Sequence, residues 1–299
     1  MKKIDFSEER QQGGQINLND HAAGAQGIQQ IEFHEEAKTD ELAPINLLKS
    51  ALAEFFGMTV FVFCGGMAVV ALDGVSVAFT HGGVLGSLII LFGNVSGGQI
   101  NPAVALGLMA IRKLHWMKGL VNIGGQILGS LLAGFLMRFG LPEVQTEASL
   151  GYPRKANVDF PKDLQAFVPE MFGTMGLVML VSYCVIKKFE ADVVGLLVGL
   201  WLIGMIFAFG GVTGTSINPC RTLGPAIFSN RIEDKFFREG WWVYYTAPFL
   251  GGLIGAFVAR YVFTSPSEDE KEEKMAKMGN QYPGNKQAAK LSEMRMMNR

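Results

Sequence analysis

Two Asn-Pro pairs, Asn101–Pro102 and Asn218–Pro219, stand inside strongly apolar stretches of the chain. Asparagine is among the best residues for capping a helix N-terminus, and proline is favoured at the first helical position. Each pair therefore predicts a helix whose N-terminus, with its partial positive charge, faces whatever lies before it. Arg221 follows the second pair, so that a cation stands in the first turn of a helix, where the helix dipole disfavours it. These groups are suited to bind, orient or repel a solute.

No pattern in the chain indicates a catalytic centre. The sequence contains no phosphate loop, no nucleophile elbow and no spacing of metal ligands. We therefore expect no enzyme activity, no cofactor and no bound metal. Cys64, Cys184 and Cys220 lie in or beside apolar segments, and their odd number favours small packing residues over disulfides. The formal net charge of −1 gives no basic surface for a nucleic acid.

The elements that must position the two Asn-Pro pairs are membrane helices. The 299 residues are 49% hydrophobic and 18% charged, whereas soluble domains carry about 25% charged residues. The apolar residues gather into six stretches long enough for a bilayer, which needs ~20 residues per helix. These stretches cover residues 49–72, 78–95, 117–139, 167–187, 192–210 and 241–263. We expect an all-α integral membrane protein with six transmembrane helices.

Two further apolar segments, 101–111 and 218–228, begin at the Asn-Pro pairs and are too short to cross a bilayer. About ten helical residues span ~15 Å, half of the ~30 Å hydrocarbon thickness. The non-helical backbone before them is tolerated at that depth only where protein buries it or where it lines a water-filled cavity. We therefore interpret both segments as re-entrant half-helices beside a polar pore.

An internal repeat orders these elements. Three pairs of stretches match in the same order: "AEFFG" with "PEMFG", "FGNVSGGQINPA" with "FGGVTGTSINPC", and "ILGSLLAG" with "FLGGLIGA". Each half holds three spans and one half-helix. Because three is odd, the second half enters the membrane from the opposite side, which makes an inverted repeat. The half-helices then dip from opposite faces and bring their N-termini together near the midplane.

The same landmarks divide the chain into five parts. They are an N-terminal tail (1–44), a first repeat (45–139), a connecting loop (140–166), a second repeat (167–264) and a charged C-terminal tail (265–299). Both tails lack the apolar area that would offset the entropy of ordering them, so we expect them to be disordered and solvated.

The stretches "SGGQINPAVALG" and "TGTSINPCRTLGPAI", together with the repeat, resemble the aquaporin (major intrinsic protein) family. The resemblance covers roughly residues 48–264. It implies an aquaporin-like right-handed bundle of six transmembrane helices and two half-helices, and a passive, proton-excluding water channel assembled as a homotetramer. The pore centre would be formed by the two Asn-Pro-Ala motifs, here Asn101, Pro102 and Ala103 with Asn218, Pro219 and Cys220. We expect the asparagine oxygens to cap their helices and the amide N–H groups to point into the pore.

The resemblance also implies a selectivity filter made of His81, Ile206, Thr215 and Arg221. Arg221 would donate to passing solutes and repel cations and hydronium. Strict water channels typically have Phe and His at the first two positions, and glycerol channels Trp and Gly, so His81 with Ile206 is more similar to plant vacuolar aquaporins. The alternatives are a buried, satisfied core histidine at His81 and a structural salt bridge or backbone clamp at Arg221.

Other positions bear on the permeant. Glycerol channels usually carry Asp after the filter arginine, where this chain has Thr222, and Pro-Leu where it has Tyr244 and Tyr245. Both differences favour water. The alternatives are a broader channel for glycerol, urea, ammonia or hydrogen peroxide, and a largely closed, gated or structural member of the family.

Glu54 and Glu170 occupy matching places in the first and fourth spans. Because an unpaired carboxylate in lipid is costly, each must face inward and accept hydrogen bonds. The resemblance suggests that they hold the loops before the two Asn-Pro pairs; proton relay is the alternative. Small residues at four-residue spacing predict close helix contacts at Gly125, Gly129, Gly251 and Gly255.

The even number of spans places both tails on one side. Basic residues near that side favour the cytoplasm: Lys49, Arg112, Lys113, Lys118, Lys187 and Lys188. The opposite side also carries basic residues, namely Arg138, Arg154, Lys155, Lys162, Arg231, Lys235 and Arg238, so the orientation rests mainly on the resemblance. The connecting loop is then extracellular. We expect a multi-pass protein of the plasma membrane, with a vacuolar membrane as the alternative, whose partners are water, small neutral solutes and membrane lipid.

Overall fold

A computed structural model describes residues 41–71, 73–140, 162–229 and 241–264. Within these ranges the regular structure is helical throughout, with eight helices. Six are long: α2 (Pro44–Ala71), α3 (Gly74–Phe92), α5 (Trp116–Gly140), α7 (Lys162–Ile186), α8 (Ala191–Thr213) and α10 (Val243–Tyr261). Two are short: α4 (Pro102–Ala110) and α9 (Pro219–Phe228). The predicted all-α class with six long and two half-length helices is confirmed.

Five of the long helices, α2, α3, α5, α7 and α8, are long and apolar enough to cross a membrane. The sixth, α10, has 19 residues; it carries Tyr244, Tyr245, Thr246 and Pro248 in its first half and Arg260 in its last turn. Large side chains such as Leu91, Phe139 and Leu196 are more than half exposed on the outside of the bundle. Such an apolar exterior suits a lipid environment.

The ends of two elements differ from the expected ones. Helix α5 runs to Gly140, and α7 begins at Lys162, five residues before the expected start of the fourth span at 167. Residues 162–166 are therefore helical, although they were assigned to the connecting loop. The remainder of that loop, 141–161, and most of both expected tails lie outside the described residues.

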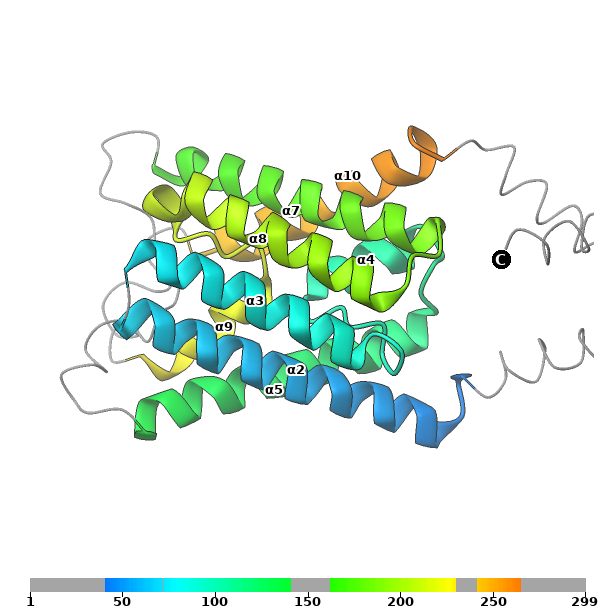
Figure 1. Cartoon of the computed structure of the whole chain (residues 1–299), viewed down its shortest axis with the longest axis horizontal. Coiled ribbons are helices and arrows are strands. Elements are labelled where there is room, and N and C mark those ends of the chain that lie inside the picture. The colour runs from blue at the N-terminus through cyan, green and yellow to red at the C-terminus, as the bar shows by residue number, and fades with distance from the viewer. Residues whose placement is uncertain (1–40, 72, 141–161, 230–240, 265–299) are drawn as a thin grey trace, which may run out of the picture. The chain divides into compact units, whose positions relative to one another are not determined.

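The helices pack in pairs that repeat between the two halves. Helix α2 packs on α5 as α7 packs on α10, and α3 packs on α8 across the halves. Each half-helix contacts the other half: α9 packs on α5, and α4 packs on α10. Figure 1 shows α4 and α9 at opposite ends of the bundle, while α2 begins and α10 finishes at the same end.

Glycines permit these close contacts. In α5, a Cβ at Gly125 or Gly129 would collide with the carbonyl oxygens of Ala51 and Phe55 in α2. In α10, a Cβ at Gly251 or Gly255 would collide with the carbonyl oxygens of Met171 and Met175 in α7. The predicted close contacts are confirmed. The crossing of α3 and α8 uses the same device with Gly82, Gly86, Gly195 and Gly199, which the sequence analysis did not single out.

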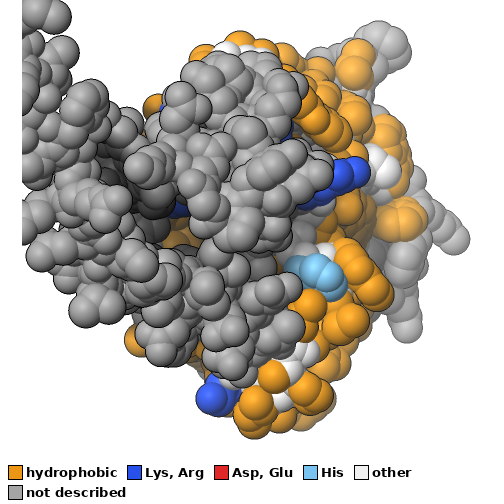
Figure 2. Space-filling view, turned by 90° about the vertical axis from the view of Figure 1, so that its right-hand side faces the viewer, with side chains coloured by type: hydrophobic (Ala, Val, Ile, Leu, Met, Phe, Trp, Pro, Cys, Tyr) orange, Lys and Arg blue, Asp and Glu red, His pale blue; other side chains and the backbone are white. Residues whose placement is uncertain are grey.

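The basic residues assigned to one side gather at one end. One lies near the start of α2, a second group lies around the turn from α4 into α5, and a third lies in the turn between α7 and α8. All of them are at the end of the bundle where α2 begins. Figure 2 looks at this end and shows Lys and Arg side chains among apolar ones.

Candidate functional site

The two half-helices begin with the same capped geometry. Asn101 precedes α4 with extended backbone (φ −162°, ψ 120°), and its Oδ1 accepts a 2.9 Å hydrogen bond from the Ala103 N–H. Asn218 precedes α9 with φ −154° and ψ 110°, and its Oδ1 accepts from the N–H groups of Cys220 (3.0 Å) and Arg221 (3.3 Å). A proline follows each asparagine. The capping through oxygen that the sequence predicts is confirmed.

The two asparagines also join the half-helices to each other. Asn101 Nδ2 donates to the Ile217 carbonyl oxygen at 2.8 Å, and Asn218 Nδ2 donates to the Ile100 carbonyl oxygen at 2.7 Å. The N-termini of α4 and α9 therefore meet at one point, each with a partial positive charge. A side-chain amide has two N–H groups, so each asparagine keeps one N–H besides the bond across the pair.

The loops before the asparagines adopt matching and strained conformations. Ile100 has φ 45° and Ile217 has φ 41°, in the left-handed region that β-branched residues rarely adopt. Gly97 and Gly214, at matching positions in the repeat, also have positive φ. Such strain persists only where the surroundings hold it, and it is concentrated at functional sites.

Two buried carboxylates hold these loops. Glu54 Oε1 and Oε2 accept the backbone N–H groups of Gln99 at 2.9 Å and Ile100 at 2.7 Å. Glu170 accepts those of Ser216 at 2.9 Å and Ile217 at 2.6 Å in the same way. Both side chains are fully buried. The expected inward, hydrogen-bonded arrangement of the two carboxylates is confirmed.

The first loop has further support from α5 that the sequence analysis missed. Gln126 Nε2 donates to Glu54 at 2.6 Å, and Asn122 Nδ2 donates to Gln99 Oε1 at 2.6 Å. Ser50 of α2 completes this group by donating to Asn122 Oδ1 at 2.7 Å. Asn122 and Gln126 are amides four residues apart in an apolar helix, which places them on one face. That spacing was a signal that could have identified them.

His81 and Arg221, which are 140 residues apart, are in contact. His81 Nδ1 lies 2.9 Å from the Val77 carbonyl oxygen, and its Nε2 lies 3.3 Å from Arg221 Nη2. A carbonyl only accepts and a guanidinium only donates, so these partners assign the proton to Nδ1 and leave Nε2 as acceptor. His81 is 1% and Arg221 6% exposed. Arg221 Nη1 is buried and has no protein partner.

Thr215 is held beside α8 next to the position of Ile206. The Thr215 hydroxyl donates to the carbonyl oxygen of Met205, the neighbour of Ile206 in α8, at 3.3 Å. Ile206 is half-buried and packs on the apolar core. Thr215 itself has φ 49° and is 1% exposed, so its position is set by the strained loop.

Thr222 and Tyr244 are two of the positions at which the resemblance separates water channels from glycerol channels. In this structure both hold the loop before Asn218. The Thr222 hydroxyl lies 2.6 Å from the Ser216 hydroxyl, and the Tyr244 hydroxyl donates to the Thr213 carbonyl oxygen at 2.8 Å. The Tyr245 hydroxyl is buried without a hydrogen-bond partner. Thr222 and Tyr244 are fully or almost fully buried. Their hydroxyl groups are therefore engaged in the scaffold of the loop.

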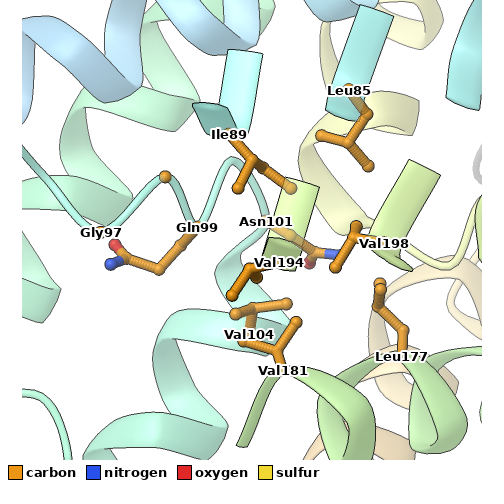
Figure 3. A pocket seen from close by; sticks show the side chains of 11 residues that line it. Leu85, Ile89, Gly97, Gln99, Asn101, Val104, Leu177, Val181, Val194 and Val198 are labelled. Carbon is orange, nitrogen blue, oxygen red and sulfur yellow. The ribbon is translucent and has the colours of Figure 1, made fainter. Parts of the chain in front are cut away.

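A narrow enclosed cavity of about 20 Å³ lies beside Asn101. About 10–15 Å³ accommodates one water molecule, so the cavity has room for about one water beside Asn101. Apolar side chains of α3, α7 and α8 face the polar loop across it (Figure 3): Leu85, Ile89, Leu177, Val181, Val194 and Val198 opposite Gln99 and Asn101. His81 precedes Leu85 by one helical turn, so the same side of α3 continues from this cavity to the His81–Arg221 contact.

The site offers no metal-binding group. Among the residues that the structure describes, no three His, Cys, Asp or Glu side chains gather in a way that could hold a metal ion. Cys64, Cys184 and Cys220 are free thiols, as expected. The groups that the site presents are the amides of Asn101 and Asn218, the N-termini of two half-helices and the guanidinium of Arg221.

Comparison with known proteins agrees with this geometry. A family model described as "Major intrinsic protein" matches residues 41–259. Aquaporin-1 of Rhizophagus irregularis is 31% identical over 222 residues, which cover 71% of this chain and 76% of that protein. Glycerol uptake facilitator protein-like 6 of Lactiplantibacillus plantarum is 29% identical over 218 residues, covering 71% of this chain and 97% of that protein. The X-ray structure of the aquaglyceroporin from Plasmodium falciparum superposes with a TM-score of 0.63 at 24% identity, covering 72% and 97% of the two chains.

Proposed function

From the premise that this chain belongs to the major intrinsic protein family and is one of its multi-pass membrane channels, we propose that it conducts water and excludes protons. Its relatives include an aquaporin and a glycerol facilitator, so the permeant has to be argued from the residues of the site.

The reciprocal contact of the asparagines is the observation that supports this proposal most directly. One N–H of each amide crosses to the other loop, and the second N–H is left for a molecule in the path. A water that accepts from both amides has used its lone pairs, so its own hydrogens point along the file. Such a water cannot accept a proton from its neighbour, and the chain of proton transfer is interrupted at this point. The two helix N-termini add a barrier against any cation.

Arg221 supplies the second barrier. Its Nη2 is engaged by His81, whereas Nη1 is buried without a protein partner. A buried donor without a partner is costly, and a passing water can accept from it. The full positive charge of the guanidinium repels cations most strongly where water is scarce. Arg221 therefore favours small neutral solutes that carry a hydrogen-bond acceptor.

A broader channel for glycerol, urea, ammonia or hydrogen peroxide is the second candidate. Ile206 favours it, because an apolar side chain at the filter offers no hydrogen bond to water and tolerates a solute with carbon atoms. The small cavity beside Asn101 favours water instead, since its volume of about 20 Å³ corresponds to about one water molecule. Comparison of water and glycerol flux separates the two candidates.

The test is stopped-flow light scattering of proteoliposomes in water, glycerol and urea gradients, with a pH-sensitive dye inside to record proton entry. We expect rapid water flux, slow glycerol and urea flux and no proton entry above that of empty liposomes. Arg221→Ala should admit more glycerol and protons, while Arg138→Ala, which removes a charge from the last turn of α5, should behave as the unmodified protein. Equal rates for water and glycerol would exclude a water-selective channel, and no flux of any solute would indicate a closed or structural member.

The oligomeric state of the protein, the membrane that holds it and its orientation there are three separate predictions. We propose a homotetramer in the plasma membrane, with the end that carries the α4–α5 and α7–α8 turns in the cytoplasm because basic residues gather there. Native mass spectrometry in detergent tests the tetramer. Fractionation of membranes tests the location, and labelling of single cysteines introduced at the two ends tests the orientation.

A further inference from the structure

Gly65 of α2 faces the imidazole of His81. An ideal Cβ at Gly65 would lie 2.5 Å from His81 Nε2, 2.8 Å from Cδ2 and 3.0 Å from Cε1. Side chains do not make contacts that short. The ring edge that carries Nε2 therefore occupies the space that the Cβ of any residue other than glycine at position 65 would need. Phe61, one turn earlier on α2, packs edge-on against the same ring, with the centroids 5.9 Å apart at 87°.

Both nitrogens of the imidazole have partners. Nδ1 is held by the Val77 carbonyl oxygen, and Nε2 is held by Arg221. The ring is rigid and short, and its residue is 1% exposed. A side chain at position 65 must therefore push the ring away from α2. The edge of the ring that moves carries Nε2, which is the atom that contacts Arg221.

The backbone does not account for a glycine at this position. Gly65 lies in the interior of α2 and is not among the glycines with positive φ. Gly66 follows Gly65 directly, and glycine weakens a helix interior relative to alanine, so neither glycine is explained by helix propensity. The three heavy atoms nearest to a Cβ at Gly65 all belong to the His81 ring.

We propose that Gly65 is a positioning residue for the filter, because its missing side chain lets His81 lie against α2 and hold Arg221 to one side of the path. The role of His81 and Arg221 as a filter rests on the proposed function, whereas the dependence of their contact on Gly65 does not. A side chain at position 65 pushes the imidazole away from α2, breaks its contact with Arg221 and narrows the path. Permeation then falls, and it falls more for glycerol than for water.

The test is a double-mutant cycle of Gly65→Ala and His81→Ala, with Gly124→Ala as matched control. Gly124 is an exposed helical glycine of α5 whose Cβ would meet no atom within 4 Å. We expect Gly65→Ala to lower the water permeability per channel about two- to tenfold, as an enforced rotamer change implies, and Gly124→Ala to leave it unchanged. In the His81→Ala background, Gly65→Ala should have no further effect. An equal loss in both backgrounds would overturn the proposal.

A spectroscopic measurement separates this proposal from the function. In 15N-histidine-labelled protein, which has four histidines, the His81→Ala variant identifies the His81 signals. We expect an unprotonated Nε2 whose resonance shifts in Gly65→Ala, because the Arg221 contact is lost; an unshifted resonance refutes the positioning role whatever the transport result. A shift in a protein that conducts nothing supports the positioning role and refutes the proposed function. If Gly65→Ala alone does not assemble, assembly of Gly65→Ala/His81→Ala supports the proposal, and failure of both contradicts it.

Discussion

The carboxylate of Glu170 accepts a 2.6 Å hydrogen bond from the backbone N–H of Ile217, a β-branched residue held at φ 41°. Ile217 directly precedes Asn218, and its carbonyl oxygen receives the amide of Asn101. Glu170 therefore acts, through the backbone of the loop, on the point where the two half-helices meet. A carboxylate that accepts two backbone N–H groups is engaged in structure, which favours this role over proton relay.

Replacement of Glu170 by Gln should destabilise the protein. Glutamine has one acceptor oxygen, and its NH2 group would face the backbone N–H of Ser216 or Ile217, so one buried donor is left without a partner. We expect a loss of about 1–3 kcal/mol, measured by thermal unfolding in detergent. Glu190→Gln is the control, because Glu190 is exposed and makes no side-chain cap bond. A Glu170→Gln protein that unfolds at the same temperature as the Glu190→Gln protein would contradict this account of the loop.

Gly255→Ala should disrupt the contact between α10 and α7. The added Cβ would collide with the Met175 carbonyl oxygen, and overpacking of a tight contact typically costs about 1–3 kcal/mol. Gly204→Ala in α8 is the matched change, since a Cβ there meets no atom within 4 Å and alanine favours the helix. The yield and melting temperature of purified protein should fall for Gly255→Ala and hold or rise for Gly204→Ala. The opposite order would show that this glycine is not needed for helix packing.

The sequence predicts those features that are set by short stretches of the chain and by their order. An Asn-Pro pair caps a helix by its own chemistry, and a repeat of three spans and a half-helix fixes the order of elements whatever the side-chain details. The contact between His81 and Arg221, and the support of Glu54 by Gln126, depend instead on how each helix is rotated against another. That rotation is set by glycines such as Gly129, whose partners lie about 70 residues away in the chain.

Asp73 gives a prediction that depends on pH. This exposed residue caps α3, and the bond from the Ser76 N–H, with those from the Ser76 hydroxyl and the Val75 N–H, lowers the pKa of its carboxyl below the usual value of 3.8. A depressed folded-state pKa stabilises the protein above 3.8, and that stabilisation is lost as the pH falls through the folded-state value.

Asp73→Ala should therefore melt at a lower temperature than the unmodified protein at neutral pH, and the difference should shrink below pH 3.8. Asp73→Asn keeps an acceptor for the Ser76 and Val75 N–H groups without a titrating proton, so its advantage over Asp73→Ala should not vary with pH. Thermal unfolding of the three proteins across this range checks both statements. A pH-independent difference between the unmodified protein and Asp73→Ala would refute the charged cap.

Asn218→Asp tests proton exclusion at the point where the half-helices meet. Aspartate has nearly the same shape and still caps α9 through an oxygen, but it cannot donate to the Ile100 carbonyl oxygen or to a water in the path. Its negative charge also offsets the positive ends of α4 and α9. We expect proton entry into proteoliposomes to rise above that of the unmodified channel, while Asn46→Asp at the start of α2 should leave it unchanged. If Asn218→Asp assembles, conducts water and still excludes protons, then the asparagine donors are not the barrier, and the charge of Arg221 must provide it alone.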